Sequence, residues 1–557
     1  MFSNTIRPFW YLQLINLLSK SASPLTLRFS LIIGLQKAGR STPLSSSCLE
    51  VSCVQETRRP RGSYLQRMYS QTDIVAQDME LYSMPKDRPI PASPITSIPV
   101  EILQEIFIRC ISPPACRPEQ VHQSYSYGFL LQTTPLSLCQ VCSLWRRSSL
   151  SLSKLWTSLD VCVSMGKARP PLPLAALWLV RSGSLPLALS LHQQNESNDN
   201  RIAAGEILDL YKLYIHRWQK VHFNLTGPRY CRLLSSQQRS APLLKQFHMQ
   251  TYYRMYEEEE KDLFGVFAFV PSLTHLHVSR IPDLNLRANG AVPIPWNQLI
   301  SLSLDYVPSV GTALLILEKC SSLKHCCIKV DAILGPLPTH PVCYNLSSLV
   351  INISNNLTEA FLANAKVPGL TRLTIYVRGP LDQYGWPQRS FASFLERSSC
   401  RLLHFEIHDS GMKYEEFVEC LHNPYLQSLE SIVVDDRRDW TWDPFITDST
   451  LALLTFPSFI HKSWKTLEEQ SGFNSSEKYQ SRVCQLPHLE AVTFRGSCLW
   501  AVDGAIADMV ESRWRFHFQE MRRIRRVQLD LLSSHVEDIR RLREFSNEGL
   551  LLDLYFR

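Results

Sequence analysis

The chain has 557 residues, of which 45% are hydrophobic and 20% are charged. This composition is typical of a folded globular protein and excludes a wholly disordered or fibrous chain. The net charge of +7 is small for this length and gives no indication of nucleic-acid binding. At about 100 to 200 residues per domain, the length allows either several domains or one long repeat array.

The cysteine content and the hydropathy pattern indicate a reducing compartment and no membrane contact. The 16 cysteines are scattered and too sparse for a disulfide scaffold, so we expect them to be reduced and mostly buried. No apolar run reaches the roughly 18 to 20 residues that a spanning helix needs. We therefore expect a cytoplasmic and/or nuclear protein that binds neither membrane nor nucleic acid.

The first 94 residues have the composition of a basic leader followed by a Ser/Pro-rich linker. Residues 1–49 contain five basic residues and no acidic residue, which matches the chemistry of a mitochondrial presequence. However, Pro8, Pro24 and Pro43 interrupt any amphipathic helix. We therefore expect a disordered segment or a chain that starts later, and we keep mitochondrial import as an alternative.

Residues 95–160 carry the pattern of a small helical module. Two stretches with apolar residues at helical spacing are separated by a proline-rich connection and followed by a short apolar pair. A unit of this size buries little apolar area, so part of its apolar surface is expected to meet a partner. The residues expected in its core or at that surface are Ile98, Pro99, Ile102, Leu103, Ile106, Phe107, Val141, Cys142, Trp145, Leu155 and Trp156.

The segments IPVEILQEIF at 98–107, VCSLWR at 141–146 and LW at 155–156 together resemble an F-box. The resemblance implies helices that dock on the adaptor subunit of an SCF-type ubiquitin ligase and, through the adaptor, on cullin. It also implies that the eleven residues named above form the adaptor-binding part or the core of the module. Two features depart from the family pattern. Ile98 stands where Leu is usual, which conserves volume, and the connection 108–135 is unusually long, which affects adaptor affinity rather than fold.

From Trp156 onward the chain contains a recurring apolar-x-x-apolar-x-apolar signature, as expected where each repeat contributes one strand to a continuous sheet, and we assign residues 161–557 to this repeat region. The steps between the clearest copies range from 23 to 29 residues, as in leucine-rich repeats. The clearest copies begin at Trp218, Leu244, Leu273, Leu299, Leu323, Leu346 and Leu370, and further copies begin at Trp156, Leu402, Leu429, Leu489 and Ile524.

Helical patterns fill several of the intervals between these strands, at 311–320, 358–365, 391–397 and 414–422. The region therefore resembles an irregular leucine-rich-repeat solenoid, although the Asn that usually follows the strand is mostly absent. We predict an α/β chain in which a small all-α module precedes strand-helix units, with an insertion at 437–480. The alternative is a non-repetitive parallel sheet.

Residues between the apolar anchors of such strands point to the opposite face, which repeat proteins commonly use for binding. This face is rich in histidine and suits an acidic or hydrogen-bonding protein surface. The candidate substrate-binding residues are Lys220, His222, His248, His275, His277, Asp305, Lys329, Arg372, Tyr376, His404, Glu406 and His408. Because the histidines lack a Cys or carboxylate at ligand spacing, we predict no metal and no cofactor.

Motifs that would indicate catalysis are absent. The chain has no phosphate-binding glycine loop, no G-x-S-x-G and no H-E-x-x-H. The single C-x-x-C at Cys139 and Cys142 is expected inside a helix, where packing explains it. The arginine-rich stretch from Arg513 to Arg526 is expected to be a solvated surface, with contact to nucleic acid or an acidic partner as the alternative.

Together these patterns predict a non-catalytic substrate-recognition subunit of an SCF-type ubiquitin ligase. Residues 95–160 would bind the adaptor, and residues 161–557 would bind a protein substrate. Two alternatives remain from the sequence: a repeat scaffold that binds a partner without directing degradation, and a protein imported into mitochondria.

Overall fold

The computed structural model describes residues 98–111, 135–226, 240–251, 270–279, 294–330, 334–338, 342–379, 385–435, 446–456, 484–496, 501–515 and 522–556. The chain divides into two compact units after Pro91, and all of these residues belong to the second unit. The expected leader and linker at 1–94 lie outside the described residues, as do most of the connection 108–135 and most of the insertion 437–480.

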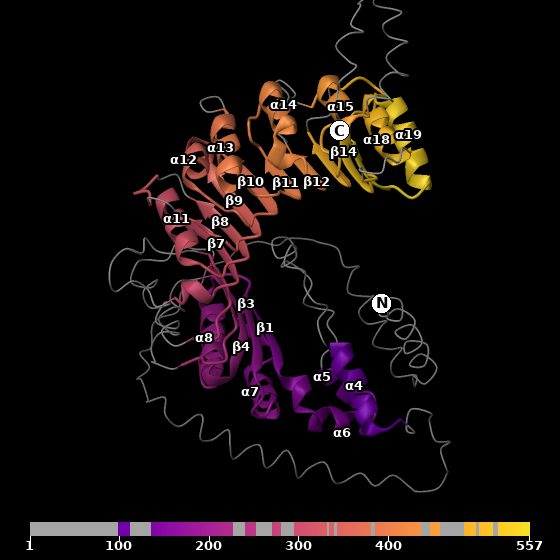
Figure 1. The fold of residues 1–557 in the computed structure, drawn as a ribbon. Helices are drawn as coiled ribbons and strands as arrows, with labels where there is room; N and C mark the ends of the chain where they lie inside the picture. Colours follow the sequence, from indigo (N-terminus) through magenta and orange to yellow (C-terminus); the bar gives the residue numbers. More distant parts are fainter. Residues whose placement is uncertain are drawn as a thin grey trace, which may run out of the picture. The chain divides into compact units, whose positions relative to one another are not determined.

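Every strand in the described ranges belongs to one 15-stranded sheet (Figure 1). From β3 to β15 the strands follow each other in the sheet as they do in the chain, all parallel, and β1 pairs with β3 and with the antiparallel β2. The strands are β1 Ser158–Ser164, β2 Lys167–Arg169, β3 Leu187–Gln193, β4 Trp218–Leu225, β5 Gln246–Thr251, β6 His275–Val278, β7 Ser301–Val307, β8 His325–Val330, β9 Ser348–Ser354, β10 Arg372–Arg378, β11 His404–His408, β12 Ser431–Asp435, β13 Ala491–Arg495, β14 Arg526–Leu531 and β15 Leu551–Phe556.

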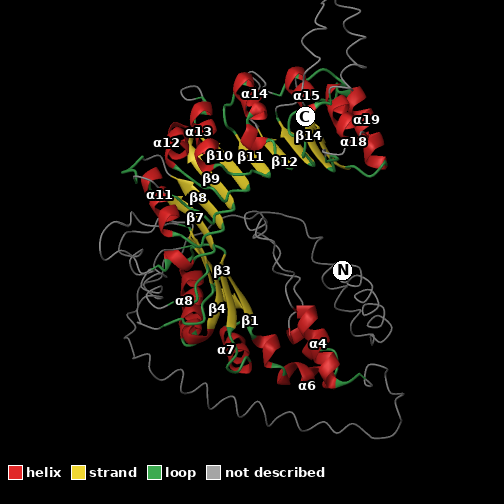
Figure 2. Ribbon diagram, in the orientation of Figure 1, coloured by secondary structure: helices red, strands yellow, loops and turns green. Residues whose placement is uncertain are grey.

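Helices alternate with the strands along most of the described chain, and α8 and α11 to α15 lie along one side of the sheet (Figure 2). The α-helices are α4 Val100–Ile111, α5 Pro135–Cys139, α6 Ser143–Ser151, α7 Leu172–Arg181, α8 Asn198–Lys212, α11 Val310–Lys319, α12 Asn355–Asn364, α13 Gln388–Ser398, α14 Tyr414–His422, α15 Asp448–Leu454, α18 Ala505–Arg515 and α19 Val536–Asn547. Short 3-10 turns are η5 Ser153–Trp156, η6 Ile215–Arg217, η8 Trp296–Gln298 and η9 Pro424–Leu426.

The strand signature of the sequence corresponds to the observed strands. In each predicted copy all three apolar anchors are buried; Leu299, Leu302 and Leu304, for example, are at most 1% exposed. The anchors point toward the helices, and the residues between them form the opposite face, which we call the open face. The predicted mixed α/β class is thus confirmed, and the helices expected at 311–320, 358–365, 391–397 and 414–422 correspond to α11, α12, α13 and α14.

One backbone hydrogen-bond pattern joins successive units. The backbone carbonyl of the residue just before one strand accepts hydrogen bonds from two amides that lead into the next strand. The Lys245 carbonyl, for example, accepts the amides of Thr274 and His275, both at 3.0 Å. This satisfies two backbone donors of each unit with one acceptor of the unit before it. The same arrangement recurs at Lys245, Thr274, Ile300, Lys324, Ser347, Thr371, Leu403, Glu430 and Glu490.

Sequence patterns missed several elements. Strand β3 lacks the expected spacing because its register with β4 shifts between Leu187 and Ala188, which removes one residue from the signature. Helices α7, α8, α18 and α19 and the final strand β15 were also not predicted. Within the insertion expected at 437–480, the described residues contain α15. No helix of the described part of the chain is both long and apolar enough to cross a membrane.

The packing of α11 gives a test of the fold. The amide of Gly311 donates to the Leu334 carbonyl at 2.9 Å, and a Cβ on Gly311 would collide with the backbone carbonyl of Pro336. We therefore expect Gly311→Ala to lower the free energy of unfolding by about 1 to 3 kcal/mol, measured by urea denaturation. Gly385→Ala is the matched control because nothing lies within 4 Å of its added Cβ. Equal stability of the two variants would contradict this packing.

Candidate binding surfaces

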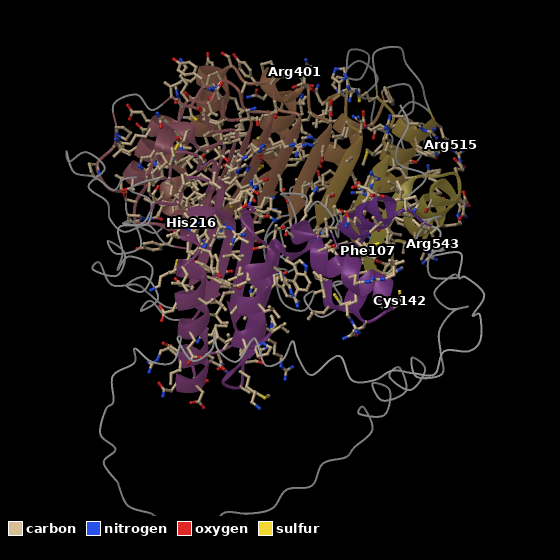
Figure 3. All side chains as sticks on the ribbon, turned by 90° about the horizontal axis from the view of Figure 1, so that it is seen from below. Phe107, Cys142, His216, Arg401, Arg515 and Arg543 are labelled. Atoms are coloured by element: carbon tan, nitrogen blue, oxygen red, sulfur yellow. The ribbon has the colours of Figure 1, made fainter. Side chains whose placement is uncertain are left out.

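The helical module at the start of the described chain has a small aromatic and aliphatic core. Leu103 and Phe107 of α4 are buried, and the Phe107 ring lies 4.8 Å from the ring of Trp145 on α6. Leu155 and Trp156 of η5 are also buried. Phe107 is labelled on these helices in Figure 3. These five predicted residues therefore form the interior of the module and do not lie on its surface.

Other predicted residues of the module are accessible. Ile102 is 55% exposed on α4, and Val141 is 48% exposed in the turn before α6. Pro99 and Cys142 are exposed as well, whereas Ile98 and Ile106 are half-buried. The neighbouring Val100 adds a further apolar side chain at 41% exposure.

The structure corrects the expectation that the C-x-x-C lies inside one helix. Cys139 ends α5, and the exposed Cys142 is the N-cap residue of α6, where its Sγ accepts the amide of Trp145 at 3.5 Å. Sequence periodicity could not show this break because Leu138, Val141 and Trp145 retain helical spacing across it. Both thiols are free.

The module joins the sheet through Trp156. Its indole nitrogen donates to the Ser149 carbonyl at 2.9 Å, and its ring packs edge-on at 5.0 Å against Trp178 of α7. The guanidinium of Arg181 lies 4.7 Å over the same ring. One fully buried tryptophan thus links α6, η5 and α7.

The predicted substrate-binding residues all lie on the open face. Because neighbouring strands pair without offset, these residues form rows that cross the sheet, in which Lys220, Gln246, His275 and Ser301 are successive register partners. His275 belongs to this row at the strand starts, whereas His248 pairs with His277 in the next row. His248, His275 and His277 are thus divided between two rows of the open face.

Four histidines form what we call the histidine stack. The ring centroids of His248 and His277 are 3.8 Å apart and almost parallel, His222 stacks on His248 at 3.9 Å, and His192 lies 5.1 Å from His222. At the other end, Nε2 of His277 lies 3.4 Å from the carboxylate of Asp305. Burial, together with the charges of His192 and His277, lowers the pKa of His222 to about 3. The stack is therefore built from close-packed rings that resist protonation at His222.

Farther along the sheet, a second group surrounds His408 and is called the His408 network. The imidazole contacts Glu406 at 2.8 Å and Asp435 at 3.5 Å. Thr374 donates to Glu406 at 3.1 Å, and Arg495 lies 3.9 Å from Asp435. Opposite charges thus alternate across β11 to β13, and Thr374 of β10 adds a neutral hydrogen-bond donor.

The charges of this network favour a protonated imidazole. Burial acts to lower the pKa of His408, but hydrogen bonds and charges from Asp435 and Glu406 raise it to about 9. Burial likewise acts to raise the pKa of Glu406, yet contact with His408 lowers it. The Tyr376 ring stacks on His408 at 4.1 Å, and burial raises the pKa of the Tyr376 phenol to about 12. Lys329, a predicted substrate-binding residue on β8, is exposed.

Sequence reasoning missed His192, Asp435 and Arg495 as site residues. The signal that could have identified them is the alternation itself, since each directly follows a buried apolar residue of its own strand, namely Leu191, Val434 or Phe494. Their contacts with His222 and His408 depend on inter-strand register, which a single strand pattern does not provide.

The described arginines of the arginine-rich stretch are exposed, as expected, except for Arg513. Arg513 of α18 is 1% exposed and donates to the carbonyls of Leu454, Leu486 and Gln485 at 2.6 to 3.0 Å, so the expectation of a solvated surface is wrong for this residue. Arg522 contacts Glu430 and Glu490 at 2.8 and 2.7 Å. Arg522 thus joins the two segments that lead directly into β12 and β13.

Within the described ranges, one group of side chains has ligand atoms close enough for a metal: Asp503, His535 and Asp538. Their oxygens are already engaged at helix ends. Asp503 accepts the amides of Glu537 and Asp538 at 3.0 and 2.9 Å, and Asp538 accepts the amide of Ala507 at 2.7 Å. Reciprocal capping of α18 and α19 explains this cluster.

Comparisons with known proteins give little guidance. No family model and no curated protein sequence matches the chain. Among solved structures, the crystal structure of a structural-genomics target from Bacteroides fragilis is similar, with 14% sequence identity, coverage of 65% of this chain and 84% of that chain, and a TM-score of 0.28. At this TM-score the similarity supports no conclusion about fold or function.

The His408 network predicts a pH-dependent contribution to stability. Because the pKa of His408 is raised from 6.5 to about 9, its contribution is fully present below pH 6.5 and is lost as the pH rises through 9. Relative to wild type, His408→Gln should lose up to about 3 kcal/mol at pH 6 and progressively less as the pH rises from 6.5 to 9, measured by denaturation across pH. His422→Gln controls for loss of an exposed histidine. A difference that does not vary with pH would contradict the ion pairs.

The histidine stack predicts the opposite pH dependence. Because the folded-state pKa of His222 is lowered to about 3, its contribution is present above pH 6.5 and is lost as the pH falls toward 3. His222→Phe keeps a stacked ring but cannot be protonated. Between pH 7 and pH 5 this variant should lose about 2 kcal/mol less stability than wild type in denaturation experiments. Equal acid sensitivity of the two proteins would contradict a neutral buried imidazole.

Proposed function

We propose that this chain is the substrate-recognition subunit of an SCF-type ubiquitin ligase. In this proposal α4 to α6 form an F-box-like module that docks on the adaptor and, through it, on cullin. The strand-helix units form an irregular leucine-rich-repeat-like solenoid whose open face binds a protein substrate. The chain itself contributes no catalytic side chain and needs no cofactor.

The observation that carries the proposal is the division of the module's apolar residues. Phe107 and Trp145 close its core, whereas Ile102 and Val141 stay about half exposed on neighbouring elements. Exposed apolar residues beside a complete core are expected where a helical module meets a partner. The sequence segments that resemble an F-box supply both sets of residues.

The mechanism would be positioning. A substrate held on the open face, while α4 to α6 hold the adaptor, would have its lysines concentrated near the ubiquitin thioester carried by the same complex. Such an effective concentration raises the transfer rate without a catalytic group from this chain. Nuclear or cytoplasmic localisation accompanies this proposal, because the adaptor and cullin would have to meet the chain there.

A matched pair of substitutions tests adaptor docking. Ile102 on α4 and Ile202 on α8 are each 55% exposed, so a charge at either position costs little folding energy. We expect the full chain to capture purified SCF adaptor in a pull-down, Ile102→Asp to lose at least about 90% of this capture, and Ile202→Asp to retain it. Thermal unfolding should be similar for the three proteins.

Two outcomes would contradict the ligase proposal. If the folded wild-type chain does not capture the adaptor, the ligase proposal is wrong. If Ile102→Asp and Ile202→Asp capture it equally well, α4 is not the docking element. If capture follows the prediction, reconstituted ubiquitin transfer separates a ligase subunit from a non-degradative scaffold. Removal of an N-terminal segment inside mitochondria would favour the imported protein.

A further inference from the structure

The first open-face residue of each strand belongs to one continuous row, which we call the strand-start row. Register pairing connects its members without a break from β4 to β14. In sheet order they are Lys220, Gln246, His275, Ser301, His325, Ser348, Arg372, His404, Ser431, Ala491 and Arg526.

The composition of this row is one-sided. It contains lysine, arginine and histidine but no aspartate or glutamate. From β4 to β10 basic residues stand on every second strand, with Gln246, Ser301 and Ser348 between them. Since neighbouring strands are about 4.8 Å apart, the basic positions repeat roughly every 9.5 Å.

The basic residues of the row act on one another. Burial lowers the pKa of His275, and the charges of His325 and Lys220 lower it further. His325, Lys220 and Arg372 are exposed. These effects disfavour the protonated form of His275, and a carboxylate bound beside it would favour that form.

Carboxylates elsewhere on the open face are engaged in other rows. Asp305 faces His277 at 3.4 Å, and Glu406 contacts His408 at 2.8 Å. Just before the row, Lys245 and Lys324 add exposed positive charge at β5 and β8. The stretch from β4 to β10 is thus a basic strip bordered by further lysines.

The period of the strip matches one peptide conformation. A polyproline II helix has three residues per turn and rises about 3.1 Å per residue, so side chains at every third position lie on one side about 9.3 Å apart. In a regular β-strand, successive side chains point to opposite sides. Of the side chains at every third position, only alternate ones would therefore face the sheet. The spacing therefore favours a polyproline II segment over a flat strand.

We propose that the strip from Lys220 to Arg372 binds an extended acidic segment of a partner protein, in polyproline II conformation, with a carboxylate at about every third residue. Four such carboxylates would lie over β4, β6, β8 and β10, while the intervening Gln246, Ser301 and Ser348 offer hydrogen bonds to the peptide backbone. The identification of this segment as part of a ligase substrate rests on the proposed function. The binding site itself is inferred from the strand-start row alone.

The probe is a fluorescent peptide of sequence (Glu-Pro-Pro)4, titrated into the full chain and followed by anisotropy. We expect saturable binding that weakens as salt is raised from 50 to 300 mM. The peptide (Gln-Pro-Pro)4 should bind at least about tenfold more weakly, since it keeps the conformation and removes the charge. A peptide with four glutamates on adjacent residues should also bind more weakly because its carboxylates do not match the spacing.

Substitutions locate the site. Lys220→Gln combined with Arg372→Gln should weaken binding of (Glu-Pro-Pro)4 at least about tenfold. Lys154→Gln combined with Arg401→Gln removes the same charge from exposed positions outside the row and should leave binding within about twofold of wild type. Arg401 is labelled in Figure 3. Unfolding temperatures of both double variants are measured alongside.

Several results would overturn the inference: no saturable binding, equal binding of the glutamate and glutamine peptides, or equal loss in the two double variants. The adaptor pull-down distinguishes this failure from failure of the ligase proposal. A chain that captures adaptor but not the peptide contradicts only the basic strip. If the chain binds the peptide but not the adaptor, the strip still stands as a binding site for an acidic segment, but the proposed role in a ligase is contradicted.

Discussion

Register between successive strands is the constraint on which the other features of the structure depend. One carbonyl before each strand accepts two amides of the next unit, and this arrangement repeats from Lys245 to Glu490. Because side chains alternate along a strand, a slip of one residue would exchange the buried anchors for the open-face residues. The fixed register therefore buries Leu276 beside Leu302 and at the same time aligns His275 with Ser301. Core and binding surface are two results of one backbone pattern.

The open face carries two polar regions with opposite electrostatic behaviour. In the histidine stack, burial and neighbouring histidines keep His222 neutral. In the His408 network, two carboxylates keep the imidazole protonated. The difference follows from what register places beside each histidine: other imidazoles on β3 to β6, and acids on β11 and β12. A third pattern, the basic strip, lies at the strand starts, where no acidic partner shares the row.

Much of the fold follows from sequence because its periodicity is local. Three apolar anchors within six residues suffice to place each of the predicted strands, and all their anchors are buried. The exceptions have physical causes. The bulge at Leu187 hides β3, and Cys142 caps a helix that periodicity joins to α5. Arg513 is buried because three carbonyls from other segments accept its guanidinium, and these contacts have no signature in the local sequence. The candidate surface was foreseen as a histidine-rich face, but its rows required the register.

The most direct test of the account is amide hydrogen exchange, measured by mass spectrometry on the intact chain. If one continuous parallel sheet runs from β3 to β15, interior strands such as β7 to β12 should exchange slowest, and the edge strands β2 and β15 fastest. The amides of Thr371 and Arg372, which share the Ser347 carbonyl, should be protected with the interior strands. An interior strand that exchanges as fast as β15 would contradict the shared register, and with it the rows of the open face.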